Sequence, residues 1–253
     1  MKNILTSIFY QPLYNLLFLF VWILPGQSLG LGIIALTVLV RLLLVPLSAK
    51  GVRAQREMQA LQPEIDKLRA EFKDQPEEMN KKMMALYQEH SVNPLGSCLP
   101  LLIQLPVLII MYRVFLSGIQ ADHLDLLYHF IPTPDHLNTI FLGVNLATPS
   151  IILAVISGLL QFVQTWQLTK KSPAQIKATT ELAKDAPKDP TQNMSQTMMY
   201  LTPILTTFIG TRLPAGLAVY WVITTLFSIV QQWWLFRTKP SIVSPHVSVS
   251  VRN

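Results

Sequence analysis

The chain has 253 residues, of which 51% are hydrophobic and only 13% are charged, whereas a soluble domain carries about 25% charged residues. This balance excludes an ordinary soluble enzyme and a disordered chain, and the single cysteine, Cys98, excludes an intrachain disulfide scaffold. The net charge of +6 is typical either of a nucleic-acid binder or of a membrane protein with basic cytoplasmic loops. The hydrophobic content indicates a polytopic membrane protein.

The first 28 residues combine an amphipathic stretch, TSIFYQPLYN, with an apolar one, LLFLFVWIL. We interpret residues 1–28 as an interfacial helix in the outer headgroup region. The alternative is a sixth span that enters from the inner side at Lys2. A cleaved signal peptide is disfavoured, because no small-x-small cleavage site precedes Gly26 and the basic region is Lys2 alone.

Five apolar stretches follow, each near the roughly 20 residues that a spanning helix needs. The predicted spans are residues 29–49, 95–117, 147–169, 196–212 and 215–236. The fourth is short and contains Pro203, and the hydroxyls of Thr206 and Thr207 are near enough to satisfy a carbonyl that this proline leaves free. We therefore expect an all-α membrane protein built as a bundle of five transmembrane helices.

Residues 50–94, between the first two spans, are too regular for a linker. Apolar residues recur at helical spacing on both sides of a turn at residues 73–76, and eight acidic residues balance eight basic ones. The pattern predicts a helical hairpin outside the membrane, with a further break at Pro63. Such a hairpin either docks a partner or is a solvated helix pair zipped along one apolar seam.

Basic residues are concentrated in three segments. Residues 50–94 hold eight, the loop 170–195 holds five and the tail 237–253 holds three, together 16 of the 20 Lys and Arg residues, whereas the loop 118–146 holds none. By the positive-inside rule these three segments and the C-terminus are cytoplasmic and the loop 118–146 is external. The positive charge is thus a topology signal, and we expect no sequence-specific binding of nucleic acid.

The sequence contains no pattern typical of catalysis. The five histidines are scattered and none has the i, i+4 spacing of a zinc helix, Cys98 has no CxxC partner, and no phosphate-binding glycine loop occurs. We therefore predict no catalytic residue, no cofactor and no metal, and we do not expect an enzyme.

Arg41 is the unusual residue of the predicted spans. It lies in LTVLVRLLLVPLS, about 12 Å below the first basic segment at the helical rise. An arginine at the centre of a spanning helix costs about 2.5–3.5 kcal/mol, and the predicted spans contain no acidic partner. The guanidinium either snorkels to the cytoplasmic headgroups or faces a hydrated cavity inside the bundle.

Each predicted span carries one polar face, which favours the cavity. Ser, Thr and Gln often join helices by hydrogen bonds, but five such faces are better explained by a shared wet interior. A positive, hydrated groove through part of the bilayer would lower the cost of moving polar backbone and acidic side chains. The candidate groove residues are Arg41, Thr37, Gln104, Gln161, Gln164, Thr206, Tyr220, Thr224 and Ser228.

Four motifs carry a resemblance to a known family. They are VRLLLVPL at residues 40–47, MQALQP at 58–63, NPLGSCLPLLIQLP at 93–106 and LPAGLAVYW at 213–221. In this order and spacing, the chain from Tyr10 to Trp234 resembles the YidC/Oxa family of membrane protein insertases. The resemblance implies a five-span core around a hydrophilic groove, with Arg41 as the family's intramembrane arginine, the hairpin at residues 52–90 and an interfacial helix around Gln11.

The resemblance also has departures. The chain lacks the first anchoring span and large periplasmic domain of Gram-negative members, so it resembles a short bacterial form of the plasma (inner) membrane. It shows no lipobox cysteine, and its mildly basic tail, residues 237–253, casts doubt on a ribosome-binding tail like that of mitochondrial members.

Three functions follow as hypotheses. The first is an insertase that passes short hydrophilic segments of nascent membrane proteins through the groove and releases their helices into the lipid bilayer, alone or with the Sec translocon, with the ribosome as a further partner. The second is a small-solute or lipid transporter, against which stand the absence of acidic residues in the spans and of an inverted repeat. The third is a structural scaffold, for which Arg41→Ala would be silent.

Overall fold

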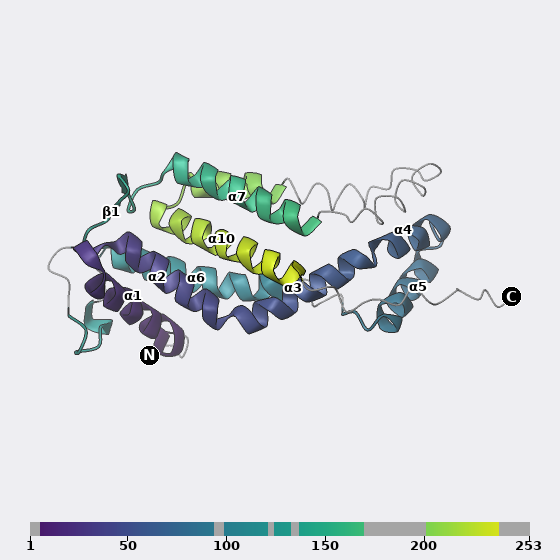
Figure 1. Cartoon of the computed structure of the whole chain (residues 1–253), viewed down its shortest axis with the longest axis horizontal. Helices are drawn as coiled ribbons and strands as arrows, with labels where there is room; N and C mark the ends of the chain where they lie inside the picture. The colour runs from purple at the N-terminus through teal and green to yellow at the C-terminus, as the bar shows by residue number, and fades with distance from the viewer. Residues whose placement is uncertain (1–5, 94–98, 121–123, 133–136, 170–200, 238–253) are drawn as a thin grey trace.

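The computed structural model describes residues 6–93, 99–120, 124–132, 137–169 and 201–237 (Figure 1). The strands found in this part of the chain are β1 (Ile140–Phe141) and β2 (Val144–Asn145), which pair antiparallel. All other extended elements are helices, so the prediction of an all-α fold is confirmed. Cys98, the loop 170–195 and nearly all of the tail 237–253 lie outside the described residues.

The long helices are named by the labels of Figure 1. They are α1 (Gln11–Ile23), α2 (Leu29–Leu43), α3 (Val45–Ala60), α4 (Gln62–Glu71), α5 (Pro76–Glu89), α6 (Leu99–Gln120), α7 (Ile151–Thr169) and α10 (Ala215–Arg237). A further helix, Leu201–Gly210, precedes α10. The short turns are η1 (Thr6–Tyr10), η2 (Pro25–Gln27) and η4 (Leu124–Leu126).

Helix α10 is the centre of the bundle and contacts α2, α3, α6 and α7. Its first six residues, AGLAVY, are all buried, since small residues there let neighbouring backbones approach closely. Hydroxyls and amides join α7 to it: Ser157 Oγ donates to the Ala218 carbonyl at 3.3 Å, and Gln167 Nε2 donates to the Ile229 carbonyl at 3.4 Å. The helix Leu201–Gly210 packs on α7 at Gly158, where a side chain would collide with Thr207.

Helix α1 packs one face against α2 and α6. Tyr14, Leu17, Phe18 and Val21 on that face are almost completely buried, whereas Trp22 and other apolar side chains of α1 and η1 are exposed. The helix has 13 residues, or about 20 Å at 1.5 Å per residue. Its interfacial position in a membrane stays a prediction.

Two helices of the described chain, α7 and α10, are long and apolar enough to cross a membrane. The pair α2 and α3, bent by 66° at the break between them, is a third candidate if it forms one broken span. Shorter apolar helices are Ile8–Ile23, Gln104–Ser117 and Leu201–Gly210. The structure thus shows two or three candidate spans, and the bundle of five remains a proposal.

The break between α2 and α3 lies at Leu44. Pro46 stands in the first turn of α3, where its missing N–H breaks no intrahelical hydrogen bond. Gln231 of α10 holds the break, because its Nε2 donates to the Val45 carbonyl at 3.3 Å and to Ser48 Oγ at 2.8 Å. Helix α3 then continues to Ala60 without interruption at Lys50, so the predicted limit between span and hairpin falls inside one helix.

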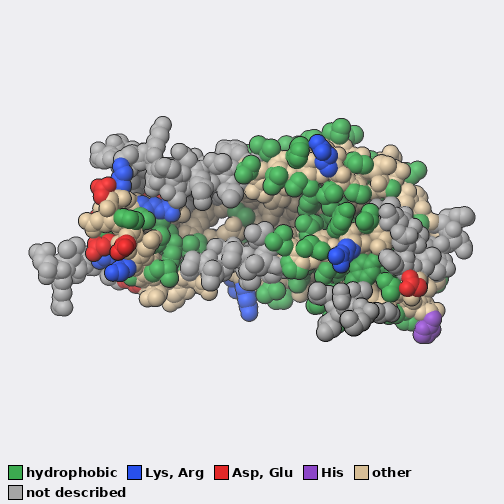
Figure 2. All heavy atoms as spheres, turned by 180° about the vertical axis from the view of Figure 1, so that it is seen from behind, with side chains coloured by type: hydrophobic (Ala, Val, Ile, Leu, Met, Phe, Trp, Pro, Cys, Tyr) green, Lys and Arg blue, Asp and Glu red, His purple; other side chains and the backbone are tan. Residues whose placement is uncertain are grey.

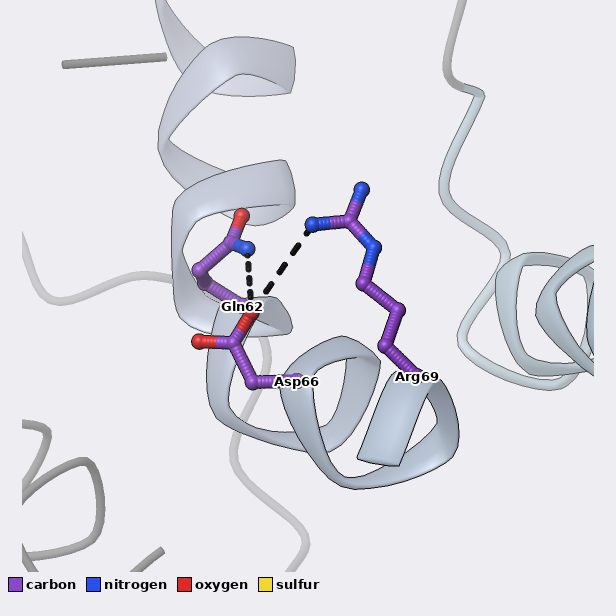
Figure 3. A network of polar contacts seen from close by, with 3 residues as sticks. All are labelled: Gln62, Asp66 and Arg69. Atoms are coloured by element: carbon purple, nitrogen blue, oxygen red, sulfur yellow. Dashed lines mark hydrogen bonds and ion pairs between the residues drawn. The ribbon is translucent and has the colours of Figure 1, made fainter. Parts of the chain in front are cut away.

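Helices α4 and α5 form a hairpin beyond the bundle (Figure 1). Its apolar seam consists of the buried Leu61, Ile65 and Val92, with partly buried Met58, Met83, Leu86 and Tyr87 packed against them. On α4, the Asp66 carboxylate accepts from Gln62 at 2.9 Å and faces Arg69 at 3.9 Å (Figure 3). Figure 2 shows charged side chains gathered on this end of the molecule and hydrophobic ones covering much of the bundle.

The segment between α6 and α7 closes the opposite end of the bundle. The Asn15 amide, which is 2% exposed, donates to the Leu126 carbonyl at 2.9 Å and accepts from the Tyr128 N–H at 2.6 Å. The N–H groups of Ala215 and Gly216, at the start of α10, donate to the carbonyls of Thr148 and Leu146. These bonds tie the segment to α1 and α10.

Candidate functional site

Three of the predicted groove residues form one hydrogen-bonded chain across three helices. Arg41 Nη2 of α2 donates to Gln104 Oε1 of α6 at 2.6 Å, and Gln104 Nε2 donates to the Tyr220 hydroxyl of α10 at 2.9 Å. Figure 1 shows these helices side by side within the bundle. The sequence places the three residues 63 and 116 positions apart, and the fold brings them together.

In the described part of the protein, no carboxylate forms an ion pair with Arg41. Arg41 is half-buried in the last turn of α2, next to exposed Leu42 and Leu43. The ion pairs found among the described residues, Arg69–Asp66 and His90–Glu64, lie in the hairpin and do not include Arg41. A guanidinium has five N–H donors, of which Gln104 takes one. Among the described residues, no second acceptor is bonded to Arg41.

Tyr220 is the fixed end of the chain. Its side chain is 1% exposed and its ring packs edge-on against Phe115 of α6, with 5.9 Å between the ring centroids. Since a tyrosine has few rotatable bonds, this packing holds the hydroxyl in one place. The Gln104 amide is thereby oriented with its oxygen toward Arg41.

The hydroxyl residues of the predicted stripes behave differently. Thr37 Oγ1 donates to the Ile33 carbonyl at 2.6 Å, and Ser228 Oγ donates to the Thr224 carbonyl at 2.9 Å, each within its own helix. Such bonds satisfy the hydroxyl locally, so these two residues add little polarity to a groove. Thr224 differs from them, because its buried Oγ1 lies one helical turn from Tyr220 and interacts with the Tyr220 hydroxyl.

The other predicted site residues stay outside the chain. Gln161, Gln164 and Thr206 are half-buried, and the described structure gives their side chains no hydrogen bond to Arg41, Gln104 or Tyr220. Gln161 and Gln164 lie on α7 and Thr206 lies on the adjoining helix Leu201–Gly210. Their place in a shared groove stays a prediction.

Sequence reasoning missed the part played by Asn15. Its sequence neighbours suggested an amphipathic surface helix, whereas its buried side chain forms hydrogen bonds to the backbone of a segment 111 residues away. A buried amide in an otherwise apolar helical face was the available signal, but nothing local indicates its partner.

The site can donate and accept hydrogen bonds and can attract negative charge. The described residues include no group of three His, Cys, Asp or Glu side chains that could hold a metal ion. Arg41, Gln104 and Tyr220 offer no activated nucleophile. The arrangement defines a class, namely membrane proteins whose helix bundle holds a fixed cation and polar side chains at its interior.

The comparisons with known proteins identify the family. The sequence profile of the family described as "60Kd inner membrane protein" matches residues 22–241. The chain belongs to this family, the YidC/Oxa family.

Relatives in three bacteria carry the name "Membrane protein insertase YidC". The protein of Fusobacterium nucleatum is 32% identical over 210 residues, which cover 83% of this chain and 87% of the relative. Those of Oleidesulfovibrio alaskensis and Francisella tularensis subsp. novicida are 36% and 37% identical over 208 residues, 82% of this chain. The matches cover only 35% and 32% of these two longer proteins.

Proposed function

We propose that the protein inserts other proteins into the bacterial plasma membrane. Polar segments of a nascent membrane protein would enter between α2, α6 and α10, and the neighbouring apolar helix would pass into lipid. The observation that carries this proposal is the Arg41–Gln104–Tyr220 chain, in which a half-buried cation donates to a neutral amide that a buried tyrosine hydroxyl orients.

The charge of Arg41 would act on the substrate's acidic residues. In a region of low dielectric constant, a charge-assisted hydrogen bond contributes about 1.5–3 kcal/mol. That energy offsets part of the cost of bringing a carboxylate below the headgroups.

The apolar faces on both sides of the site would form the exit to lipid. Leu105 and Ile109 are exposed on α6, and Ile204 and Phe208 are exposed on the helix Leu201–Gly210. A substrate helix that slides along these side chains exchanges one apolar surface for another, so little free energy opposes its release.

The positions of the segments relative to the membrane belong to the same proposal. The hairpin, the loop 170–195 and the tail would be cytoplasmic, and the segment 118–146 would be external, as the basic residues indicate. The hairpin would receive the nascent chain, with the ribosome or the Sec translocon as partner. Helix α1 would lie in the outer interface as a support for α2.

Depletion of the protein, followed by an insertion assay on a small two-span substrate with an acidic connecting segment, tests the proposal. Insertion should fall on depletion, stay low with Arg41→Ala and recover with Arg41→Lys, because charge is the property that matters. Unchanged insertion after depletion would refute the proposal. Solute or lipid flux in proteoliposomes that depends on Arg41, without an insertion defect, would instead support a transporter.

A further inference from the structure

The β1–β2 hairpin displays apolar side chains where a polar turn would be ordinary. Its register pairs Ile140 with Asn145 and Phe141 with Val144, which leaves Leu142 and Gly143 as the turn. Leu142 is 87% exposed and Ile140 is 60% exposed. Two-residue turns of this kind, with φ of +49° and +78°, favour Asn or Asp before Gly. A leucine in the left-handed region at the most exposed point of the turn therefore needs an explanation other than the turn itself.

The hairpin is held firmly by its base, so the tip cannot fold back onto the bundle. Phe141 packs against Gly30 at the start of α2, so closely that any side chain at Gly30 would collide with the ring. The Leu29 N–H donates to the Asn138 carbonyl at 3.0 Å, and the Asn138 N–H donates to the Gln27 carbonyl at 3.2 Å. The exposed face is thus presented by a fixed scaffold.

The hairpin lies at the level where α7 begins. Helix α7 has 19 residues, about 28 Å at the helical rise, which matches a hydrocarbon core about 30 Å thick. Only 17% of its most apolar window is buried inside the protein, and its first residue, Ile151, is 70% exposed. Since a helix needs about this length to cross the core, Ile151 is expected near the membrane boundary, and the β1–β2 hairpin, which ends at Asn145, is expected near the same boundary.

The exposed apolar surface continues on both sides of the hairpin. Trp22 and Ile23, at the end of α1 that leads into α2, are exposed, as are Ile151 and Ile152 at the start of α7. Figure 1 shows the hairpin between these two helix ends. A tryptophan at this level is typical of the membrane interface.

We propose that the β1–β2 hairpin is a membrane anchor whose tip, Ile140 and Leu142, is immersed in the lipid leaflet at the boundary where α2 and α7 begin. The partner is the glycerol and upper acyl-chain region of phospholipids, since the segment 118–146 has no Lys or Arg to bind their phosphates. Immersion of about 5–10 Å is ordinary for an apolar element at this boundary. The anchor fixes the height of the bundle in the bilayer.

Depth-dependent fluorescence quenching tests the anchor. In the full chain with Cys98 replaced by serine, an environment-sensitive fluorophore is attached at Leu142→Cys, or at Ile140→Cys as a second reporter, and the protein is reconstituted into phosphatidylcholine and phosphatidylglycerol nanodiscs. Nitroxide lipids labelled near the glycerol should quench both positions more strongly than lipids labelled near the chain end. Aqueous iodide should quench both positions several-fold less than it quenches a fluorophore at the control position Asp74→Cys, in the exposed turn between α4 and α5.

A lipid control and two contrary outcomes complete the test. Leu159→Cys, exposed in the middle of α7, should be quenched most by lipids labelled near the chain end. Iodide quenching at Leu142 equal to that at Asp74 would place the tip in water and overturn the proposal. Protection from both iodide and nitroxide lipids would mean that protein covers the tip, and would overturn it as well. None of these readouts depends on insertion activity.

Discussion

Gln104 forms hydrogen bonds through both its amide oxygen and its amide nitrogen. The residue at this position therefore determines whether the positive charge of Arg41 is neutralised. Its oxygen accepts from the guanidinium and its nitrogen donates to a buried tyrosine. A neutral amide at this position orients the arginine and leaves its charge intact. A carboxylate would orient it equally well and neutralise it.

Gln104→Glu is therefore expected to impair the insertion of substrates whose translocated segment is acidic. An ion pair with Arg41 competes with the substrate for a charge-assisted hydrogen bond, which corresponds to about a tenfold loss in initial insertion rate. Substrates with a neutral segment should insert nearly as before. The matched variant Gln104→Leu keeps the charge and should spare acidic substrates, so equal defects in both variants would contradict the argument.

Asn15 anchors the segment between α6 and α7 through both ends of its amide. Asn15→Leu keeps the volume, removes one of the two side-chain donors to the Leu126 carbonyl and leaves the half-buried Tyr128 N–H without its partner, at a cost of about 1–3 kcal/mol. We expect a lower melting temperature in detergent and faster proteolysis within residues 124–150.

The control for this prediction is Gln11→Leu. Gln11 Nε2 is the second donor to the Leu126 carbonyl, at 3.1 Å, so its loss leaves that carbonyl satisfied by Asn15. The expected destabilisation is about 1 kcal/mol or less. If the Asn15 variant were as stable as the Gln11 variant, the hydrogen bonds of the Asn15 side chain would not contribute to stability.

At this scale, the structure joins the long side chains of the predicted groove residues and leaves the short hydroxyls apart. Arg41, Gln104 and Tyr220 meet because their side chains span the distance between helices. Thr37 and Ser228 lie at the predicted helical spacing, but their short hydroxyls reach a carbonyl of their own helix first. Spacing cannot distinguish the two outcomes, because both satisfy the same periodic pattern.

At the scale of elements, the connection between the bundle and the hairpin depends on Arg56 of α3. Its guanidinium nitrogens lie 3.4 Å from the carbonyls of Leu235 and Phe236, at the end of α10, and its guanidinium carbon lies 5.1 Å from the Phe236 ring centroid. A cation at the C-terminus of a helix stabilises the last carbonyls and the helix dipole. Arg56 thereby joins two elements that the sequence separates by about 180 residues.

Arg56→Gln should loosen α3 against α10. The loss is about 1 kcal/mol, and electron-paramagnetic-resonance distances between spin labels at Asp74 and Trp233 should become broader. Arg53→Gln, a change of the same type at an exposed position one turn earlier, should leave the distribution as it is. Equal broadening in both variants would contradict a specific role for the contacts of Arg56 with the end of α10.

The helical hairpin formed by α4 and α5 should lose stability at alkaline pH. Burial raises the pKa of the Tyr87 phenol above 10.0, and nearby Arg69 offsets part of the shift. A raised folded-state pKa means that the folded form holds the proton more tightly, so this contribution is complete below about pH 10 and is lost as the pH rises through the raised value. The melting temperature of the Tyr87→Phe variant should fall less steeply than that of the unmodified protein between about pH 9 and about pH 11. Parallel declines in both proteins would exclude Tyr87 as the cause.

The boundaries of elements show where local sequence information ends. The turn predicted at residues 73–76 overlaps the break between α4 and α5: α4 ends at Glu71, and Pro76, which could not continue that helix, is the first residue of α5. The break at Leu44 was not predicted: Pro46 permits either a straight start or a bend, and Gln231, 186 residues away, holds the bent form. A contact so distant leaves no trace in the local pattern.

At the scale of the molecule, the fold has two ends of different chemistry. One end carries the charged helical hairpin. The other carries the segment that is joined to α2 and α10 by backbone hydrogen bonds and to α1 by the Asn15 side chain. Apolar side chains of α6, α7 and the helix Leu201–Gly210 are exposed between the two ends. This division is what a bilayer imposes on a bundle, because polar surface is tolerated only beyond the hydrocarbon core.

We predict the orientation of the two ends in the membrane from the distribution of Lys and Arg, and a labelling experiment tests it. In the Cys98→Ser background, Asp125→Cys lies in the closed end and Asp74→Cys in the turn of the charged hairpin, and both positions are exposed. A membrane-impermeant thiol reagent added to intact bacteria stripped of any outer barrier should label position 125 at once and position 74 only after the membrane is opened. The driving force is the retention of Lys and Arg on the cytoplasmic side during insertion. The reverse order of labelling would mean that the bundle has the opposite orientation in the membrane. Arg41 would then lie near the outer surface, where it could not meet a chain arriving from the ribosome.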